Sequence, residues 1–208
     1  MSHFSDRSLS LVAIVTALLL FVVAGLFGGP DYARDVIAIH SLAIERATHL
    51  GLTGRAIFIT HFGGAGGMFT ILLIALALLA FLRRWRAALA LAGIVILGRM
   101  TVELLKLLID RPRPYFGPYP VEIASLSFPS GHSANSMITF LALALIVAPV
   151  RYRSAAVATA VAGSILIGVT RPLLGVHWPS DVIGGWAFGI AWVVGGVALS
   201  RRWFSAAE

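Results

Sequence analysis

Long apolar segments separated by short polar breaks are the feature that most restricts the fold of this chain. A helix needs about 20 apolar residues to cross a bilayer, and segments near that length recur along all 208 residues. Six are expected to be transmembrane helices: residues 9–28, 63–82, 87–109, 131–149, 155–170 and 181–199. The prediction is an all-α polytopic membrane protein, with its six helices in one bundle and residues 1–208 as a single integral membrane domain.

The composition excludes several other classes of protein. Hydrophobic residues make up 59% of the chain and charged residues only 12%, which is too few to cover a soluble globule. The net charge of +7 could suggest nucleic-acid binding, but the basic residues lie in short loops beside apolar segments, so we expect no nucleic-acid partner. The absence of cysteine excludes disulfides, thiolate metal sites and a cysteine nucleophile.

The first apolar segment could instead be a signal peptide. It is long, lacks an A-x-A cleavage site and is followed by further apolar segments, so we expect it to be a retained anchor. No sequence feature indicates an obligatory protein partner; the expected partners are the bilayer and a substrate.

The arginines near the ends of these segments predict the orientation. In a six-span arrangement one side of the membrane receives all of the following: Arg7, Arg83, Arg84, Arg86, Arg151, Arg153, Arg201 and Arg202. Basic loops favour the cytoplasm, so both termini are expected there. Residues 31–62, 110–130 and 171–180 then face outward and hold most of the remaining polar chemistry.

Residues 31–62 are expected to contain a short amphipathic helix on the outer membrane surface. Its apolar positions recur at helical spacing, and Asp35 is one of the polar residues between them. Capping of the bundle is the preferred interpretation, and admission of lipid is the alternative. Gly63, Gly64, Gly66 and Gly67 are expected to permit close helix packing without any role in chemistry.

Three polar clusters at the outer ends of apolar segments are the candidate site. Lys106, the only lysine, precedes Arg113 by seven residues, and Pro112 should end the helix so that the chain turns and brings the two cations together. Arginine offers a planar fork and lysine a mobile point charge, which together suit a tetrahedral anion. Snorkelling of the lysine is the alternative interpretation.

The second cluster is Phe128-Pro129-Ser130-Gly131-His132. Backbone N–H groups and the Ser130 hydroxyl at the start of the following helix could bind a phosphate. Ser130 could equally be the N-cap of that helix, and one turn can serve both roles. His132 is better placed for chemistry.

The third cluster places Arg171 before His177, which Asp181 follows after four residues. Asp181 could accept a hydrogen bond from one imidazole nitrogen and leave the other free to attack phosphorus. A metal site is the weaker alternative, because the ligand set is incomplete and nearby cations would repel a metal ion.

These clusters closely resemble the three-part signature of the type 2 phosphatidic acid phosphatase superfamily. The signature is K-x6-R-P, then P-S-G-H, then S-R-x5-H-x3-D, and the only departure here is Thr170 in place of serine. Arg111-Pro112 is interpreted as a decoy, since only Arg113 has the required distance from Lys106. The six-span layout is similar to that of the bacterial members, which implies the cytoplasmic (inner) membrane with the active site facing outward.

The resemblance implies a metal-free lipid phosphatase without a cofactor. Lys106, Arg113 and Arg171 would bind phosphate with Ser130 and the Gly131 backbone. His177 would attack phosphorus and form a phosphohistidine, His132 would protonate the leaving oxygen and then activate water, and Asp181 would orient His177.

Two further acids and two alternative functions complete the prediction. Arg99 and Glu103 are expected to pair with each other, with Glu103 bound to Lys106 as the alternative, and Glu122 could contact a head group. A lipid carrier would not need a nucleophile, but a phosphotransferase would use the same phosphoenzyme. Soluble vanadium haloperoxidases, which belong to the same superfamily, do not fit the apolar segments.

The sequence does not fix the substrate. Undecaprenyl diphosphate is preferred over phosphatidylglycerol phosphate, phosphatidic acid and lipid A phosphates.

Overall fold

The computed structural model describes residues 2–123 and 125–205, and within them all regular structure is helical. The elements are α1 (Ser2–Leu26), α2 (Ala33–Thr48), α3 (Leu50–Gly63), α4 (Ala65–Phe81), α5 (Trp85–Ile109), α6 (Gly131–Ile146), the 3-10 turn η1 (Val150–Tyr152), α7 (Arg153–Leu173) and α8 (Pro179–Ser205). The expected all-α class is confirmed.

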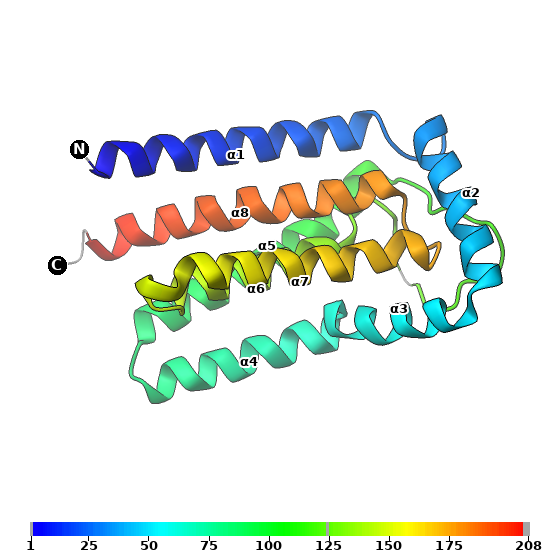
Figure 1. Cartoon of the computed structure of the whole chain (residues 1–208). Helices are drawn as coiled ribbons and strands as arrows, with labels where there is room; N and C mark the ends of the chain where they lie inside the picture. The colour runs from blue at the N-terminus through cyan, green and yellow to red at the C-terminus, as the bar shows by residue number, and fades with distance from the viewer. Residues whose placement is uncertain (1, 124, 206–208) are drawn as a thin grey trace.

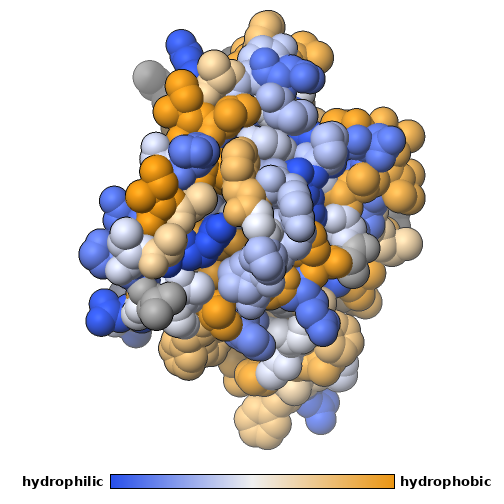
Figure 2. Space-filling model, turned by 90° about the vertical axis from the view of Figure 1, so that its right-hand side faces the viewer, coloured by the Kyte–Doolittle hydropathy of each residue, from blue (hydrophilic) through white to orange (hydrophobic). Residues whose placement is uncertain are grey.

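Most helices run lengthwise in one bundle, and α2 lies across one end of it (Figure 1). The start of α1 and the end of α8 lie at the opposite end, and these two helices pack along each other. The α2 end, which faces the viewer in Figure 2, mixes hydrophilic and hydrophobic side chains. We refer to it below as the α2 end.

The apolar core lies between α4, α5, α6 and α8. Leu79, Leu91, Val102 and Val193 are completely buried there. By contrast, α1 exposes a long series of leucines and valines, which suits a helix that contacts lipid on most of its surface. Burial of apolar surface between helices and exposure of the rest fit a membrane protein.

Four helices are long and apolar enough to cross a membrane, and a bent pair formed by α3 and α4 would make five. The remaining predicted span, 131–149, corresponds to α6, which has only 16 residues and falls short of the roughly 20 required. Since α6 contacts α3, α4, α5, α7 and α8, its neighbours cover it. The six-span count therefore stays a prediction.

The second predicted span, 63–82, begins too late. The helical structure starts earlier with α3, and α3 and α4 meet at a bend of 44°. α4 alone has 17 residues, which gives about 25 Å of helix, less than the roughly 30 Å of a hydrocarbon core. The glycines that the sequence assigned to packing lie at this bend.

Residues 31–62 contain the expected short helix, which is α2, and most of a second helix, α3, which was not predicted separately. α2 packs on α3, α7 and α8, in agreement with a capping role. The assignment of Asp35 to the polar, exposed face was wrong: it is only 6% exposed. Its carboxylate accepts hydrogen bonds from the backbone N–H groups of Gly29 and Ser180 and from the Ser180 hydroxyl, and these donors offset the cost of burial.

The side chains of Arg7, Arg201 and Arg202, on which part of the predicted orientation depends, lie outside the described residues. The sidedness of the molecule stays a prediction.

Candidate active site

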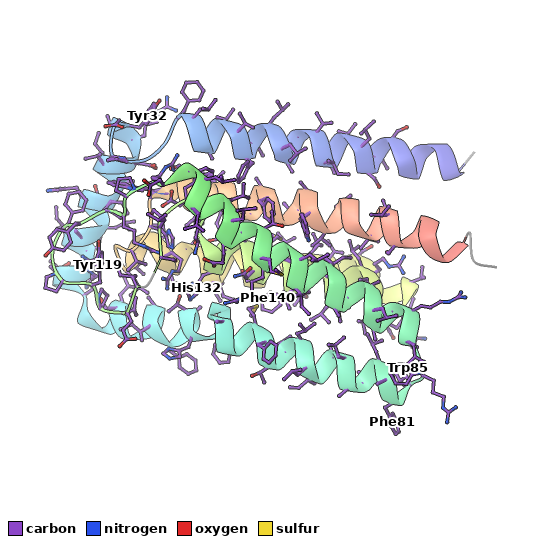
Figure 3. The ribbon with its side chains drawn as sticks, turned by 180° about the vertical axis from the view of Figure 1, so that it is seen from behind. Tyr32, Phe81, Trp85, Tyr119, His132 and Phe140 are labelled. Atoms are coloured by element: carbon purple, nitrogen blue, oxygen red, sulfur yellow. The ribbon has the colours of Figure 1, made fainter. Side chains whose placement is uncertain are left out.

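The three polar clusters come together near the α2 end. They line a cavity of about 240 Å³ that contains six of the predicted site residues: Lys106, Arg113, Gly131, His132, Arg171 and His177. Figure 3 shows His132 inside the bundle at this end, while Phe81 and Trp85 mark the other end. The remaining two predicted site residues, Ser130 and Asp181, are completely buried and do not line the cavity.

His177 lies in the loop between α7 and α8, held on both sides of its ring. Its Nδ1 is 3.3 Å from Asp181 Oδ2, and its Nε2 is 3.0 Å from Arg113 Nη1. Arginine can only donate, so Nε2 accepts with its lone pair and Nδ1 carries the hydrogen that points to Asp181. The nitrogen with the lone pair is the one beside the phosphate-binding candidates.

Asp181 is fixed by more donors than His177 alone. The backbone N–H of Trp178 donates to Oδ2 at 2.9 Å and the Ser127 hydroxyl donates to the same oxygen at 2.5 Å. Arg111 donates to Oδ1 at 2.8 Å. A carboxylate with this many donors keeps its charge and orientation even when it is completely buried.

Burial lowers the pKa of the His177 imidazole well below its usual 6.5, and the nearby Arg113 and Arg171 cations lower this pKa further. Each of these effects disfavours the protonated ring. The imidazole is therefore neutral at pH 7, and its lone pair is available. Protonation occurs only when the pH falls below 6.5.

This state of His177 is testable by NMR. In protein labelled at histidine Cε1, the signal missing from a His177→Ala variant should show no titration between pH 8 and pH 6.5, because the ring is already neutral. In denatured protein the same label should titrate near pH 6.5. A midpoint at or above 6.5 for the native His177 signal would contradict the lowered pKa.

Lys106 and Arg113 meet as the sequence predicted. α5 ends with Asp110 in the left-handed conformation, and the chain turns there, before Pro112. Both cations then bond one hydroxyl: Ser125 Oγ accepts from Lys106 Nζ at 2.9 Å and from Arg113 Nη2 at 3.4 Å. Ser125 was not predicted, since nothing in the loop sequence distinguishes it.

Arg171 reaches the same cavity from the last turn of α7. It is 3% exposed, and its Nη1 donates to Thr60 Oγ1 at 2.6 Å. Its Nε is buried and has no hydrogen-bond partner among the described residues. A buried donor without a partner is costly, which is consistent with a site that awaits an anion.

Ser130 is at the N-cap position of α6, but its side chain makes no capping hydrogen bond. Its hydroxyl accepts from Ser133 Oγ at 3.1 Å, and its backbone N–H donates to the Asp181 carbonyl at 3.0 Å. Gly131 lies against Lys106: a Cβ on this residue would be 3.1 Å from Nζ. The absence of a side chain at Gly131 therefore leaves space for the ammonium beside the start of α6.

His132 follows in the first turn of α6 and is half-buried. Its ring lies against the bend between α3 and α4, where a Cβ on Gly63 would be 3.3 Å from Cδ2 and one on Gly64 would be 3.6 Å from Nε2. A Cβ on Gly63 would also be 2.3 Å from Ile167. Gly63 thus allows close packing, as expected, and Gly63 and Gly64 in addition make room for His132, whereas a Cβ on Gly66 would contact nothing.

Arg111, interpreted as a decoy for the phosphate-binding motif, does not line the cavity, but it has a supporting role that the sequence did not reveal. Arg111 is 6% exposed, and besides Asp181 its guanidinium donates to Ser180 Oγ at 3.0 Å and to the carbonyls of Ala24 and Gly25 at 3.0 and 2.6 Å. It joins the end of α1 to the start of α8. Spacing from Lys106 excludes Arg111 as a phosphate ligand but does not reveal this role.

The expected pair of Arg99 and Glu103 was wrong. Glu103 Oε1 lies 3.3 Å from Lys106 Nζ, which was the alternative prediction. The buried ammonium lies one turn away on the same helix face and attracts the carboxylate. Within the described chain Arg99 makes no hydrogen bond and no ion pair.

Among the described residues, no three His, Cys, Asp or Glu side chains come together as a potential metal site. The cavity is lined by Lys106, Arg113 and Arg171 instead. A cluster of cations can stabilise a phosphoryl group directly.

Comparison with known proteins agrees with this geometry. A family model described as the PAP2 superfamily matches residues 87–205. A crystal structure titled as the first transmembrane PAP2 type phosphatidylglycerolphosphate phosphatase, from Bacillus subtilis, superposes with a TM-score of 0.77 and 26% identity. That alignment covers 91% of this chain and 96% of the other.

Curated relatives are phosphatases of lipids. Phosphatidylglycerophosphatase B of Bacillus subtilis is 32% identical over 64% of this chain and 67% of its own length. Decaprenylphosphoryl-5-phosphoribose phosphatase of Mycobacterium tuberculosis is 32% identical over 74% and 82%. Lipid A 1-phosphatase of Rhizobium johnstonii is 42% identical over 47% of this chain, which spans 41% of that relative.

Proposed function

The chain belongs to the PAP2 superfamily and is a phosphoric ester hydrolase of the membrane, and from this premise we propose that it dephosphorylates a lipid through a phosphohistidine on His177, without a metal. The observation that carries the proposal is the geometry of His177, which has Nδ1 beside Asp181 and Nε2 beside Arg113. This arrangement presents a neutral nucleophile to an anion site.

In the first step the lone pair of His177 Nε2 attacks phosphorus and the bond from phosphorus to the lipid oxygen breaks. Protonated His132 donates its proton to that oxygen, so the lipid leaves as an alcohol, or as a monophosphate when the substrate is a diphosphate. Lys106, Arg113 and Arg171 stabilise the charge on the transferring group, with the Gly131 backbone as a further donor. Ser130 is buried outside the cavity and contributes through the turn that holds Gly131.

In the second step neutral His132 accepts a proton from water while the water oxygen attacks phosphorus. The bond from phosphorus to Nε2 breaks, inorganic phosphate forms, and the His177 lone pair is restored. Asp181 accepts from Nδ1–H throughout and stabilises the positive imidazole of the intermediate. No group besides water is consumed.

We infer that undecaprenyl diphosphate is the preferred substrate and that the reaction occurs on the extracytoplasmic face of a bacterial cytoplasmic membrane, with both termini inside. Support comes from Arg83 and Arg84, which lie in the chain between Phe81 and Trp85 at the end of the bundle opposite α2 (Figure 3), and from Arg151 in the turn η1 between α6 and α7. Relatives that act on phosphatidylglycerol phosphate and decaprenyl or lipid A phosphates support an amphiphilic substrate.

Phosphate release from purified protein in detergent tests this proposal. We expect release from undecaprenyl diphosphate at a higher kcat/KM than from phosphatidylglycerol phosphate, phosphatidic acid or lipid A 1-phosphate, with activity unchanged by EDTA. If no phosphate were released from any of these lipids, the proposal of a lipid phosphatase would be contradicted. If activity were lost in EDTA, the metal-free mechanism would be contradicted. Appearance of a phosphorylated acceptor in place of inorganic phosphate would indicate a phosphotransferase.

A further inference from the structure

An unpaired cation lies beside the candidate active site. Arg99 is on α5, two turns before Lys106 and about 10 Å further from the α2 end along the helix. It is half-buried and makes no hydrogen bond or ion pair with any described residue. A guanidinium without a partner among membrane-spanning helices is costly, so a partner from outside the chain is expected.

Arg99 lies where two cavities meet. It lines the site cavity of about 240 Å³ and also an adjoining cavity of about 500 Å³ between α4, α5 and α6. Only two other residues, Ala65 and Asn135, line both. The larger cavity is otherwise lined mainly by apolar side chains, including Met68, Leu72 and Ile138, and therefore suits a lipid tail.

Asn135 is a second polar group at this junction with no partner. It is 8% exposed, its Oδ1 is buried without a hydrogen bond, and no described residue bonds its amide nitrogen. Buried polar atoms in proteins are normally satisfied. The Asn135 Nδ2 atom is directed toward the site cavity, where it would be 3.9 Å from a Cβ on Gly131, and an amide nitrogen can donate to phosphate, as the Arg99 guanidinium can.

The acidic residues of the cavity do not cancel the charge of Arg99. Glu103 is bound to Lys106, and Glu122 lines the site cavity but not the larger one. With phosphorus at His177 and the tail in the apolar cavity, the part of the lipid next to the scissile phosphate passes between Arg99 and Asn135.

We propose that Arg99 and Asn135 form a subsite for a second phosphate, located between the scissile phosphate and the lipid tail. The inference rests on the proposed function and assigns residues to the preference for lipids that carry two phosphates in series on one tail. Arg99 supplies the charge-assisted hydrogen bonds and Asn135 a neutral one. Lipid monophosphates bind only to Lys106, Arg113 and Arg171, the cations that surround the scissile phosphate.

Two substrates with the same tail test the subsite: farnesyl diphosphate and farnesyl monophosphate. In Arg99→Gln, kcat/KM for the diphosphate should fall about 10- to 100-fold, which is typical for loss of a hydrogen bond to a charged group, and kcat/KM for the monophosphate should change by less than about threefold. Arg99→Lys retains the charge and should restore most of the diphosphate activity.

The outcomes separate the subsite from the proposed function. The subsite would be overturned if Arg99→Gln lost kcat/KM equally on both substrates or lost none on either. It would also be overturned if wild-type protein cleaved only the monophosphate. Each of these results would leave the proposed phosphatase activity intact. No phosphate release from either substrate by wild-type protein would overturn the phosphatase itself. The monophosphate activity of each variant also reports whether it is folded.

Discussion

His177→Ala is expected to lower phosphate release by a factor of about a thousand or more, because it removes the nitrogen that we propose attacks phosphorus. The side chain is 1% exposed and lies between Asp181 and Arg113, so no other group can take its place. With substrate labelled on its terminal phosphate, wild-type protein quenched in alkali should retain label and the variant should retain none.

The matched control is His49→Ala, since the His49 side chain is exposed and its one ion pair among the described residues is with Glu45. It should keep full activity and full labelling. Label that persists in His177→Ala, or equal activity of the two variants, would place the nucleophile on another residue.

Arg111→Met is expected to lower both stability and turnover. Removal of one partner from a buried ion pair typically costs about 3 to 5 kcal/mol, which corresponds to a fall in Tm on the order of 10 °C for a chain of this size. We expect kcat to fall about 100-fold, as for loss of an outer partner of a reactive group. KM should change little, because Arg111 lies outside the cavity.

A measurement on folded protein distinguishes a positioning role from a purely structural one. At a temperature at which Arg111→Met is fully folded, its kcat should still be about 100-fold below that of wild-type protein. If turnover per folded molecule equalled the wild-type value, Arg111 would act only on stability. Thermal unfolding and phosphate release of the same preparations give both readouts.

The helices and the members of the candidate site could largely be predicted from the sequence. Apolar length places α1, α5, α7 and α8 within a few residues, since in a bilayer a helix must satisfy its own backbone. The spacing correctly predicted that Lys106 and Arg113 share one cavity, although α5 ends at a left-handed Asp110 and not at Pro112.

The supporting partners could not be predicted, for physical reasons. Ser125, Ser127 and Thr60 contact the site through single hydroxyls, and any serine or threonine brought near would serve. Arg99 and Glu103 have ideal spacing for a helical pair, yet Lys106 attracts Glu103 more strongly. Which cation Glu103 binds depends on how the side chains pack in three dimensions. The spacing of residues along one helix does not describe that packing.

Arg111 bonds the last turn of α1 through the carbonyls of Ala24 and Gly25, and this helix precedes the part of the chain that matches the family, residues 87–205. Backbone carbonyls are present whatever the side chain, so this contact depends on the position of the last turn of α1 and not on the identity of its side chains. A fragment that starts at α5 would keep every motif residue and still lose the part of the chain that holds Arg111 beside the Asp181 carboxylate.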